Sequence, residues 1–364
     1  LGCGRPVIST ASEYAKYLID STVGLLVKPK NDRALRDAIL QMLQDPKWMK
    51  SLSAQAYEKS RPMTWPNVAA AHMNLYKKFT EFGEEEKKLP ELKLDHLKRL
   101  TDKFGILHFA KYSTPETRYG YNLDDNARAL IVATQSYARN HTVEMLDYIK
   151  IYLSYFEFVM RSDGTFANIV SSKLVRDKTR DEDVQGRAFW ALGYVAAQNS
   201  LPKEVVDKAT ILLKKGLRNV RGLKSPRAIA FTMIGLYYFI KSNPQKSLMQ
   251  IFTKFADSLT ALYKENSDAD WQWFEPHLTY SNAALPEALF YAYELVKDKK
   301  YLNVAEESIA FLKGITFLKK HYSPIGQKGW FFRDKARAFF DQQPEDTAHM
   351  VQAKLTAYNV TGKS

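Results

Sequence analysis

The chain has 364 residues, of which 45% are hydrophobic and 26% charged, so it is long enough for two or three domains with ordinary cores. Its net charge of +13 permits an anionic partner, but Lys and Arg are scattered and no nucleic-acid motif occurs, so we expect no nucleic-acid binding. No stretch reads as a signal peptide or a transmembrane segment. The single cysteine, Cys3, excludes an internal disulfide and indicates a cytoplasmic protein.

The first 80 residues have the pattern of an α/β domain. Two apolar runs, PVIST and VGLLV, predict buried strands, and DRALRDAILQMLQ, PKWMKSLSAQAYEKS and WPNVAAAHMNLYKKF predict three helices. Asp32 is a candidate N-cap of the first helix, and Pro66 suits the start of the third. Residues 81–91, EFGEEEKKLPE, form a charged break that predicts a linker.

Residues 92–364 are predicted to be almost entirely helical. After a first helix near 92–103, apolar residues recur at helical spacing in 122–139, 143–160, 184–198, 203–218, 226–241, 246–264, 282–297, 301–313 and 347–358. Alternate helices are rich in small residues, as in VQGRAFWALGYVAA, and those between them are amphipathic, as in KEVVDKATILLKKGL. Helices of small apolar residues pack inside and amphipathic ones face water, so helical hairpins around a centre are expected.

Five inner helices are counted, whereas a closed ring of six hairpins needs a sixth. The sequence stops where another outer helix is expected and starts inside an α/β pattern, so we expect a piece cut at both ends. The predicted fold class is mainly α: an incomplete (α/α)6 toroid preceded by a small α/β remnant.

Acidic residues gather where the inner helices begin, and these starts share one mouth of such a ring. Asp, Ser and Asn are also preferred N-caps, which is the structural explanation for any one of them. Capping does not require the triplet Asp181-Glu182-Asp183, or two tryptophans beside Glu275 in DWQWFEPHL. Glycosidic hydrolysis needs two carboxylates about 5.5 Å or about 6.5–9.5 Å apart. The longest loops, 161–182 and 314–345, are predicted at this mouth.

Other kinds of site have little support in the sequence. His108, His277 and His349 are the histidines near the mouth, and their spacing does not predict a metal site. No phosphate-binding glycine loop of the P-loop or dinucleotide type occurs. We therefore expect no metal and no tightly bound cofactor.

Residues 1–80 resemble the C-terminal end of retaining GT-B glycosyltransferases of family 4. The matching segments are LGCGRPVIST, TVGLLVKPKNDRALRDAILQMLQD and TWPNVAAAHMNLYKKF. The resemblance implies that a nucleotide-sugar donor lies near Gly4, Pro6, Ser9, Thr10 and Gly24. The acidic motif of that family and the acceptor domain are absent from this sequence, so these residues alone are not expected to transfer sugar.

Residues 92–364 resemble the (α/α)6 six-hairpin domains of glycosidases and sugar epimerases, including those fused to some bacterial family 4 glycosyltransferases. The resemblance rests on YNLDDNARAL, DEDVQGRAFWALGY, WQWFEPHLTYSNAALPEALF and EDTAHMVQAKLTAY. It implies catalytic residues among Asp124, Asp125, Glu182, Asp183, Glu275 and Asp346. The predicted substrate-binding residues are Tyr119, Tyr121, Arg227, Trp271, Trp273, His277, Asn282 and Trp330.

Three functions follow. The first is a carbohydrate-active protein whose helical domain binds or hydrolyses an oligosaccharide: Glu182, Asp183 or Glu275 would protonate the leaving oxygen, and Asp125 is the candidate that activates water. The second is a helical domain that binds glycan acceptors without catalysis. The third is sugar isomerisation, for which His277 and His349 are the candidate bases. The sugar, the linkage and the oligomeric state stay open.

Overall fold

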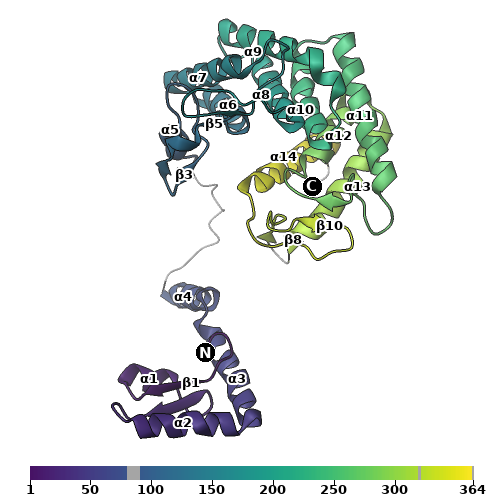
Figure 1. Ribbon diagram of the computed structural model, residues 1–364. Helices are drawn as coiled ribbons and strands as arrows, with labels where there is room; N and C mark the ends of the chain where they lie inside the picture. Colours follow the sequence, from purple (N-terminus) through teal and green to yellow (C-terminus); the bar gives the residue numbers. More distant parts are fainter. Residues whose placement is uncertain (80–90, 319–320, 363–364) are drawn as a thin grey trace. The chain divides into compact units, whose positions relative to one another are not determined.

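The computed structural model describes residues 1–79, 91–318 and 321–362, and its contacts divide the chain into two compact units (Figure 1). The first unit is Leu1–Leu92 and the second is Lys93–Ser364. All of the predicted linker, 81–91, except its last residue lies outside the described residues.

The first unit is a two-stranded parallel sheet with helices. Strand β1 (Val7–Thr10) pairs with β2 (Gly24–Val27), and the helices are α1 (Glu13–Leu18), α2 (Asp32–Gln44), α3 (Pro46–Ser60) and α4 (Trp65–Phe79). The two predicted strands and three predicted helices are thus confirmed, and α1 was not predicted. Asn31 caps α2, since its side chain accepts a hydrogen bond from the Ala34 amide; the prediction that Asp32 is the cap is wrong.

The close pairing of β1 and β2 explains why position 24, which the family resemblance assigned to the donor site, is a glycine. A Cβ on Gly24 would lie 2.0 Å from the carbonyl oxygen of Val7, its partner in the parallel register. Only a residue without a side chain permits this approach. Gly24 therefore has a structural role in the strand pair.

The second unit is built from helical hairpins. Its helices are α5 (Asp95–Leu100), α6 (Leu123–Asn140), α7 (Val143–Val159), α8 (Glu182–Ala196), α9 (Lys203–Gly216), α10 (Pro226–Ser242), α11 (Lys246–Asn266), α12 (Ala284–Val296), α13 (Lys299–Thr316) and α14 (Pro344–Thr361). Short antiparallel pairs join the loops: β3 (Ala110–Lys111) with β4 (Thr114–Pro115), β5 (Tyr121–Asn122) with β6 (Ile169–Val170), β7 (His277–Leu278) with β10 (Phe331–Phe332), and β8 (Phe317–Leu318) with β9 (His321–Tyr322). From α6 onward, each predicted helix is found within a few residues of its predicted ends.

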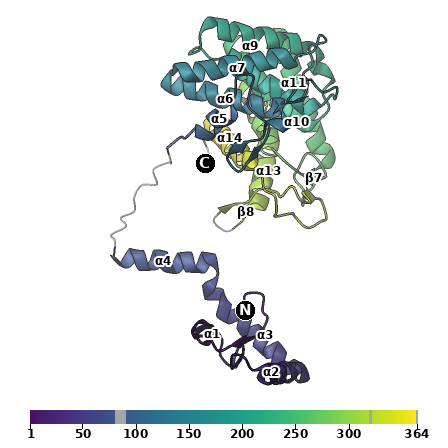
Figure 2. The same ribbon diagram turned by 60° about the vertical axis from the view of Figure 1, so that its left-hand side comes forward.

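Inner and outer helices alternate in the order that residue size predicted. Helices α6, α8, α10, α12 and α14 pack side by side in chain order, and α7, α9, α11 and α13 each pack against the inner helix before them. Figure 1 shows α9, α11 and α13 outside α8, α10 and α12, and Figure 2 again shows α9 at the edge of the second unit. Outer helices bury one stripe: Val205, Ala209 and Leu212 of α9 are buried and Ile211 is exposed.

Small residues let the central inner helices approach backbone to backbone. A Cβ on Gly193 of α8 would lie 2.3 Å from the carbonyl oxygen of Gly235 of α10, and one on Gly235 would lie 2.1 Å from that of Phe189. Because the inner helices run parallel, their N-terminal ends and the loops before them meet at one end of the unit.

Candidate functional site

A cavity of about 730 Å³ lies where the N-terminal ends of α6, α8 and α14 meet; we call it the cleft. Its lining residues are Asn122, Asp124, Arg128, Asn168, Asp181, Asp183, Val184, Arg187, Tyr280, Gln327, Trp330, Gln343, Pro344, Glu345 and Ala348. Asp124, Asp183 and Trp330 are the predicted site residues that it contains. The size suits a sugar or a drug-sized ligand, for which pockets of about 300–1,000 Å³ are usual.

The residue just before α6 and the residue just before α8 cap these helices. The carboxylates in the first turns of the two helices therefore remain available to line the cleft. Asn122 caps α6 by accepting a hydrogen bond from the Asp124 amide at 2.7 Å, and Asp181 caps α8 by accepting from the Asp183 amide at 2.9 Å. The N-cap of α6 is therefore Asn122 and neither Asp124 nor Asp125. Capping leaves the Asp124 and Asp183 side chains to line the cleft.

Asp124 lies between two arginines. It forms an ion pair with Arg187, whose side chain is 5% exposed, and a second with Arg128 at 3.2 Å. Burial raises the pKa of Asp124 above its usual value, while the two arginines oppose the rise and Glu345 adds to it. Arg128 also pairs with Glu345 of α14, which links the first and last inner helices across the cleft.

Asp183 lies in a different setting, bonded to hydroxyl groups. It accepts hydrogen bonds from Ser225 at the start of α10 and from the phenol of Tyr280. The guanidinium of Arg187 lies 5.4 Å from the centre of the Tyr280 ring, and the ring of Trp330 lies 6.1 Å from it. One wall of the cleft is thus aromatic, and aromatic faces stack on the C–H faces of sugars.

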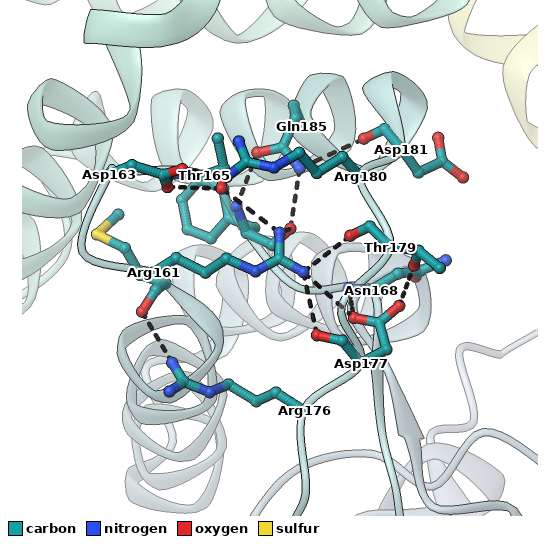
Figure 3. Close-up of polar contacts among 12 residues, drawn as sticks. Arg161, Asp163, Thr165, Asn168, Arg176, Asp177, Thr179, Arg180, Asp181 and Gln185 are labelled. Carbon is teal, nitrogen blue, oxygen red and sulfur yellow. Dashed lines mark hydrogen bonds and ion pairs between the residues drawn. The ribbon is translucent and has the colours of Figure 1, made fainter.

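Loop 161–182, which supplies Asn168 and Asp181 to the cleft, is held by Arg161 (Figure 3). The Arg161 guanidinium donates to the carbonyl oxygens of Phe166, Asp177 and Thr179, at 3.1, 3.1 and 2.8 Å. The planar guanidinium group of Arg161 therefore connects segments of this loop that are far apart in sequence. This loop forms part of a rigid rim.

Three predicted acids lie outside the cleft and have structural partners. Asp125 bonds to the Nδ1 of His108 at 2.7 Å and lines a separate cavity of about 260 Å³. Glu182 accepts from the backbone amides of Lys224 and Ser225, both at 2.6 Å. The third, Glu275, pairs with the buried Arg227 at 2.7 Å. The catalytic roles predicted for these acids have no support in their positions.

Four more of the predicted site residues lie behind the cleft. Arg227, Asn282 and Asp346 are buried there, and His277 lies at the edge of this group. Arg227 donates to the carbonyl oxygen of Tyr280 and to Asn282, and Asn282 accepts from the Thr279 amide. The Nε2 of His277 lies 3.4 Å from Glu275. Asp346 is 3% exposed, and burial raises its pKa to about 7. These residues shape the loops and do not line the cleft.

The predicted sugar-stacking aromatics are mostly core residues. Trp271 and Trp273 are buried in the hydrophobic core, and Trp271 donates its indole N–H to the carbonyl oxygen of Glu275 at 2.7 Å. Tyr121 is also buried and donates to Asp102 at 2.6 Å. Tyr119 is exposed but packs against Phe109 outside the cleft. The burial of Trp271, Trp273 and Tyr121 gives no support to the prediction that these side chains bind sugar.

The sequence predicted no site role for Arg128, Arg187, Tyr280 or Glu345, all of which line the cleft. The prediction selected acids at helix starts, whereas Arg128 and Arg187 each lie one turn after such an acid, at i+4 from Asp124 and Asp183. Residues four apart share a helix face, so this spacing could have identified both arginines.

The first unit has a cavity of about 680 Å³, beside the C-terminal ends of β1 and β2. Ser9 and Thr10 of the predicted donor site line it, with Lys28, Lys30 and Asn31. Gly4, Pro6 and Gly24 are not among its lining residues. In residues 1–79, 91–318 and 321–362, no group of three His, Cys, Asp or Glu side chains could hold a metal ion. No helix in this part of the chain is long and apolar enough to cross a membrane.

Solved structures with the same arrangement of helices confirm the predicted fold class. Cellobiose 2-epimerase from Bacillus thermoamylovorans matches with a TM-score of 0.57 and 13% identity, over 74% of this chain and 80% of that chain. A D-mannose isomerase matches with a TM-score of 0.56 and 11% identity, over 74% and 79%. A family 105 glycoside hydrolase from C. acetobutylicum matches with a TM-score of 0.50 and 13% identity, over 68% and 83%. The chain is mainly helical, and its second unit is of the (α/α)6 toroid type, with five inner helices in the part of the chain that the structure describes.

At the sequence level, no family model matches the chain, and no curated protein matches it.

Proposed function

We propose that the second unit binds an oligosaccharide in the cleft and hydrolyses a glycosidic bond with Asp124 and Asp183. The observation that carries this proposal is that two carboxylates from neighbouring inner helices line one cavity together with Tyr280 and Trp330. Glycoside hydrolysis requires a pair of carboxylates, and an aromatic wall suits the binding of a sugar ring. Structural neighbours that include a family 105 glycoside hydrolase support the same class of substrate.

The two carboxylates suit different roles. Asp124 is the acid that protonates the leaving oxygen, because burial raises its pKa and so favours the protonated form that such an acid needs. Asp183 is the carboxylate that activates water or attacks the sugar, oriented by the hydroxyls of Ser225 and Tyr280. Arg187 lies between them, in contact with Asp124 and over the ring of Tyr280.

Amide variants test this reaction. In Asp124→Asn and Asp183→Asn, cleavage of a panel of oligosaccharides should fall at least about 100-fold, as expected when a general acid or base is lost. Asp207→Asn, on the exposed face of the outer helix α9, is the control and should cleave like the unaltered protein. Wild-type cleavage by both cleft variants would exclude the hydrolase assignment.

Glycan binding without catalysis is the second candidate, and one observation favours it. Asp124 is already paired with Arg187 and Arg128, and Asp183 with two hydroxyls, so both carboxylates have partners within the protein. Under this alternative, Trp330→Ala should weaken glycan binding about tenfold or more, while the amide variants change it little. Binding on a glycan array with no turnover would select it.

Sugar isomerisation, the third possibility, has less support. Its candidate base His349 is fully buried between the rings of Trp190 and Phe231, each 5.4 Å away, and His277 does not line the cleft. A base must reach the proton that it abstracts.

For the first unit we propose descent from a GT-B nucleotide-sugar domain. Support comes from the cavity beside the strand ends, where Ser9 and Thr10 are joined by Lys28, Lys30 and the N-terminal end of α2, a combination that suits a diphosphate. Calorimetric titration of the chain with uridine and guanosine diphosphates tests this. Binding that Lys30→Ala weakens supports the proposal, and no binding of either nucleotide contradicts it.

A further inference from the structure

A second cavity, of about 170 Å³, lies deeper between the inner helices than the cleft does; we call it the inner cavity. Every inner helix contributes a pair of residues one turn apart: Ile131 and Gln135, Trp190 and Tyr194, Ile234 and Tyr238, Glu287 and Tyr291, Gln352 and Thr356. On α6, α8 and α14 these pairs lie C-terminal to the residues that line the cleft. Leu355 and Asn359 also line the cavity and are exposed, so it reaches the surface.

The two cavities share no lining residue among those that the structure places around them. At the level between them, the rings of Trp190, Phe231 and His349 pack against one another, with centres 5.4 Å apart for each pair. Burial lowers the pKa of His349 to about 3, so this ring is neutral. A ligand of the inner cavity would therefore enter beside the exposed residues Leu355 and Asn359 of α14 and not through the cleft.

Glu287 is the acid of the inner cavity, and its carboxyl group is incompletely bonded. The residue is 3% exposed; Oε1 accepts a 3.4 Å hydrogen bond from Thr356, and Oε2 has no hydrogen-bond partner. No Lys, Arg or His is among the lining residues that the described chain supplies. A buried carboxyl group without a cation or full hydrogen bonding is costly, so such a group in a cavity open to solvent needs an explanation.

Aromatic side chains surround this acid. The hydroxyls of Tyr238 and Tyr291 are 3.0 Å apart, and Thr356 donates to Tyr291 at 3.1 Å. Trp190 and Tyr194 complete the aromatic lining. Aromatic faces attract cations, and a carboxylate supplies the opposite charge, so this set of side chains matches an organic ammonium group.

We propose that the inner cavity binds a small organic cation with a primary ammonium group, held by Glu287 and the surrounding aromatic rings. The volume, well below the roughly 300–1,000 Å³ of drug-sized pockets, limits the ligand to a few non-hydrogen atoms. The proposal concerns a different cavity from the cleft and does not depend on the reaction proposed there.

Binding is coupled to loss of a proton from Glu287. Burial raises the pKa of Glu287 to about 8, so the free carboxyl group is protonated at neutral pH and must ionise to pair with the ammonium. The other titratable groups facing it, Tyr194, Tyr238 and Tyr291, have pKa values raised by burial and stay neutral. Nearby, Lys241 and Glu294 neutralise each other in an ion pair. Below pH 8, the affinity should fall about tenfold for each unit of pH.

Calorimetric titration of the whole chain with ethanolamine tests the proposal. Ethylene glycol, which replaces the amine by a hydroxyl, is the matched neutral probe, and potassium chloride is the inorganic cation probe. Titrations in two buffers of different ionisation enthalpy count the protons released. We expect saturable binding of ethanolamine, with up to one proton released, and no binding of either control probe.

Two variants locate the site. Glu287→Gln keeps the shape of the protonated acid but cannot ionise, so ethanolamine binding should weaken at least tenfold at pH 8 and lose its pH dependence. Asp183→Asn removes an acid of the cleft and should leave this binding unchanged. Equal binding of ethylene glycol or potassium, retained binding in Glu287→Gln, loss in Asp183→Asn, or no binding of ethanolamine would each overturn the proposal.

Discussion

Two single residues show how the neighbouring helices decide the state of a carboxyl group at the start of an inner helix. Asp124 lies at the first turn of α6, where two arginines and the cleft surround it. Glu287, at the first turn of α12, lies in an aromatic setting without a cation, and its pKa rises to about 8. Both are acids in the first turn of an inner helix, Asp124 partly buried and Glu287 buried, and the described residues give arginine partners to Asp124 but none to Glu287. The difference comes from neighbouring helices, since local sequence is acidic and apolar in both cases.

The first prediction concerns the pH dependence of stability. The folded protein holds the Glu287 proton up to about pH 8, whereas an unfolded chain releases it near the ordinary value of 4.5, so unfolding becomes easier as pH rises between these values. Glu287→Gln removes this effect. Its free energy of unfolding, relative to the unaltered protein, should increase by up to about 1.4 kcal/mol per pH unit in that window.

Urea unfolding at several pH values between 4.5 and 8 measures this difference. Glu157→Gln is the control: Glu157 is an exposed acid paired with Lys208 on the neighbouring outer helix, and its variant should not show this rise. A constant difference between Glu287→Gln and the unaltered protein across the window would contradict the raised pKa.

At the scale of elements, the toroid depends on how closely its inner helices approach. Gly193 and Gly235 bring α8 and α10 into backbone contact, and this contact sets the spacing of the ring at its centre. The same spacing positions Asp183 of α8 beside Ser225 at the start of α10. Small residues in the inner helices thus influence both the core and the cleft.

The second prediction compares the stability effect of replacing a glycine on an inner helix with that of replacing a glycine on an outer helix. Gly235→Ala places a methyl group against the backbone of Phe189 and should destabilise the second unit by about 1–3 kcal/mol or more, because the helices must move apart. Gly314→Ala on outer helix α13 meets nothing within 4 Å and should be neutral or stabilising by up to about 1 kcal/mol. Thermal unfolding followed by circular dichroism compares the two, and equal effects would refute the close packing.

At the scale of the whole molecule, the two units have separate cores. The second unit has one continuous hydrophobic core that extends from α6 to α14, and the first has a small cluster of Ala15, Ile19, Val23 and Ala56. Every residue that lines the cleft and the inner cavity belongs to the second unit. Folding and ligand binding by this unit therefore do not require residues of the first.

The third prediction is that residues 93–364 fold alone. The isolated unit should unfold cooperatively, with a melting temperature within a few degrees of that of the corresponding transition of the full chain, because its hydrophobic core contains no residue of the first unit. Any glycan that binds the full chain should bind the isolated unit with the same affinity. Calorimetry and glycan titration check both statements, and an isolated unit without a cooperative transition would contradict them.

Local sequence was sufficient for most of the architecture. The helices from α6 to α14 and the alternation of inner and outer helices follow from the spacing of apolar and small residues, which reflects short-range helix geometry and burial. The location of the cleft at the inner-helix starts was also predictable, because parallel helices begin at the same end. Asp124, Asp183 and Trp330 were identified on this basis and line the cleft.

Only the tertiary structure decided which polar residues face the cleft. Glu182 and Asp183 are adjacent, yet Glu182 accepts hydrogen bonds from the backbone before α10, and Asp183 lines the cavity. Trp271 and Trp273 looked like sugar-binding residues but are part of the core. Periodicity assigns a residue to a helix and a face, whereas the direction of a loop side chain depends on contacts with residues distant in sequence. The inner cavity arises in the same way, since its ten paired residues come from five helices that only the tertiary arrangement brings together.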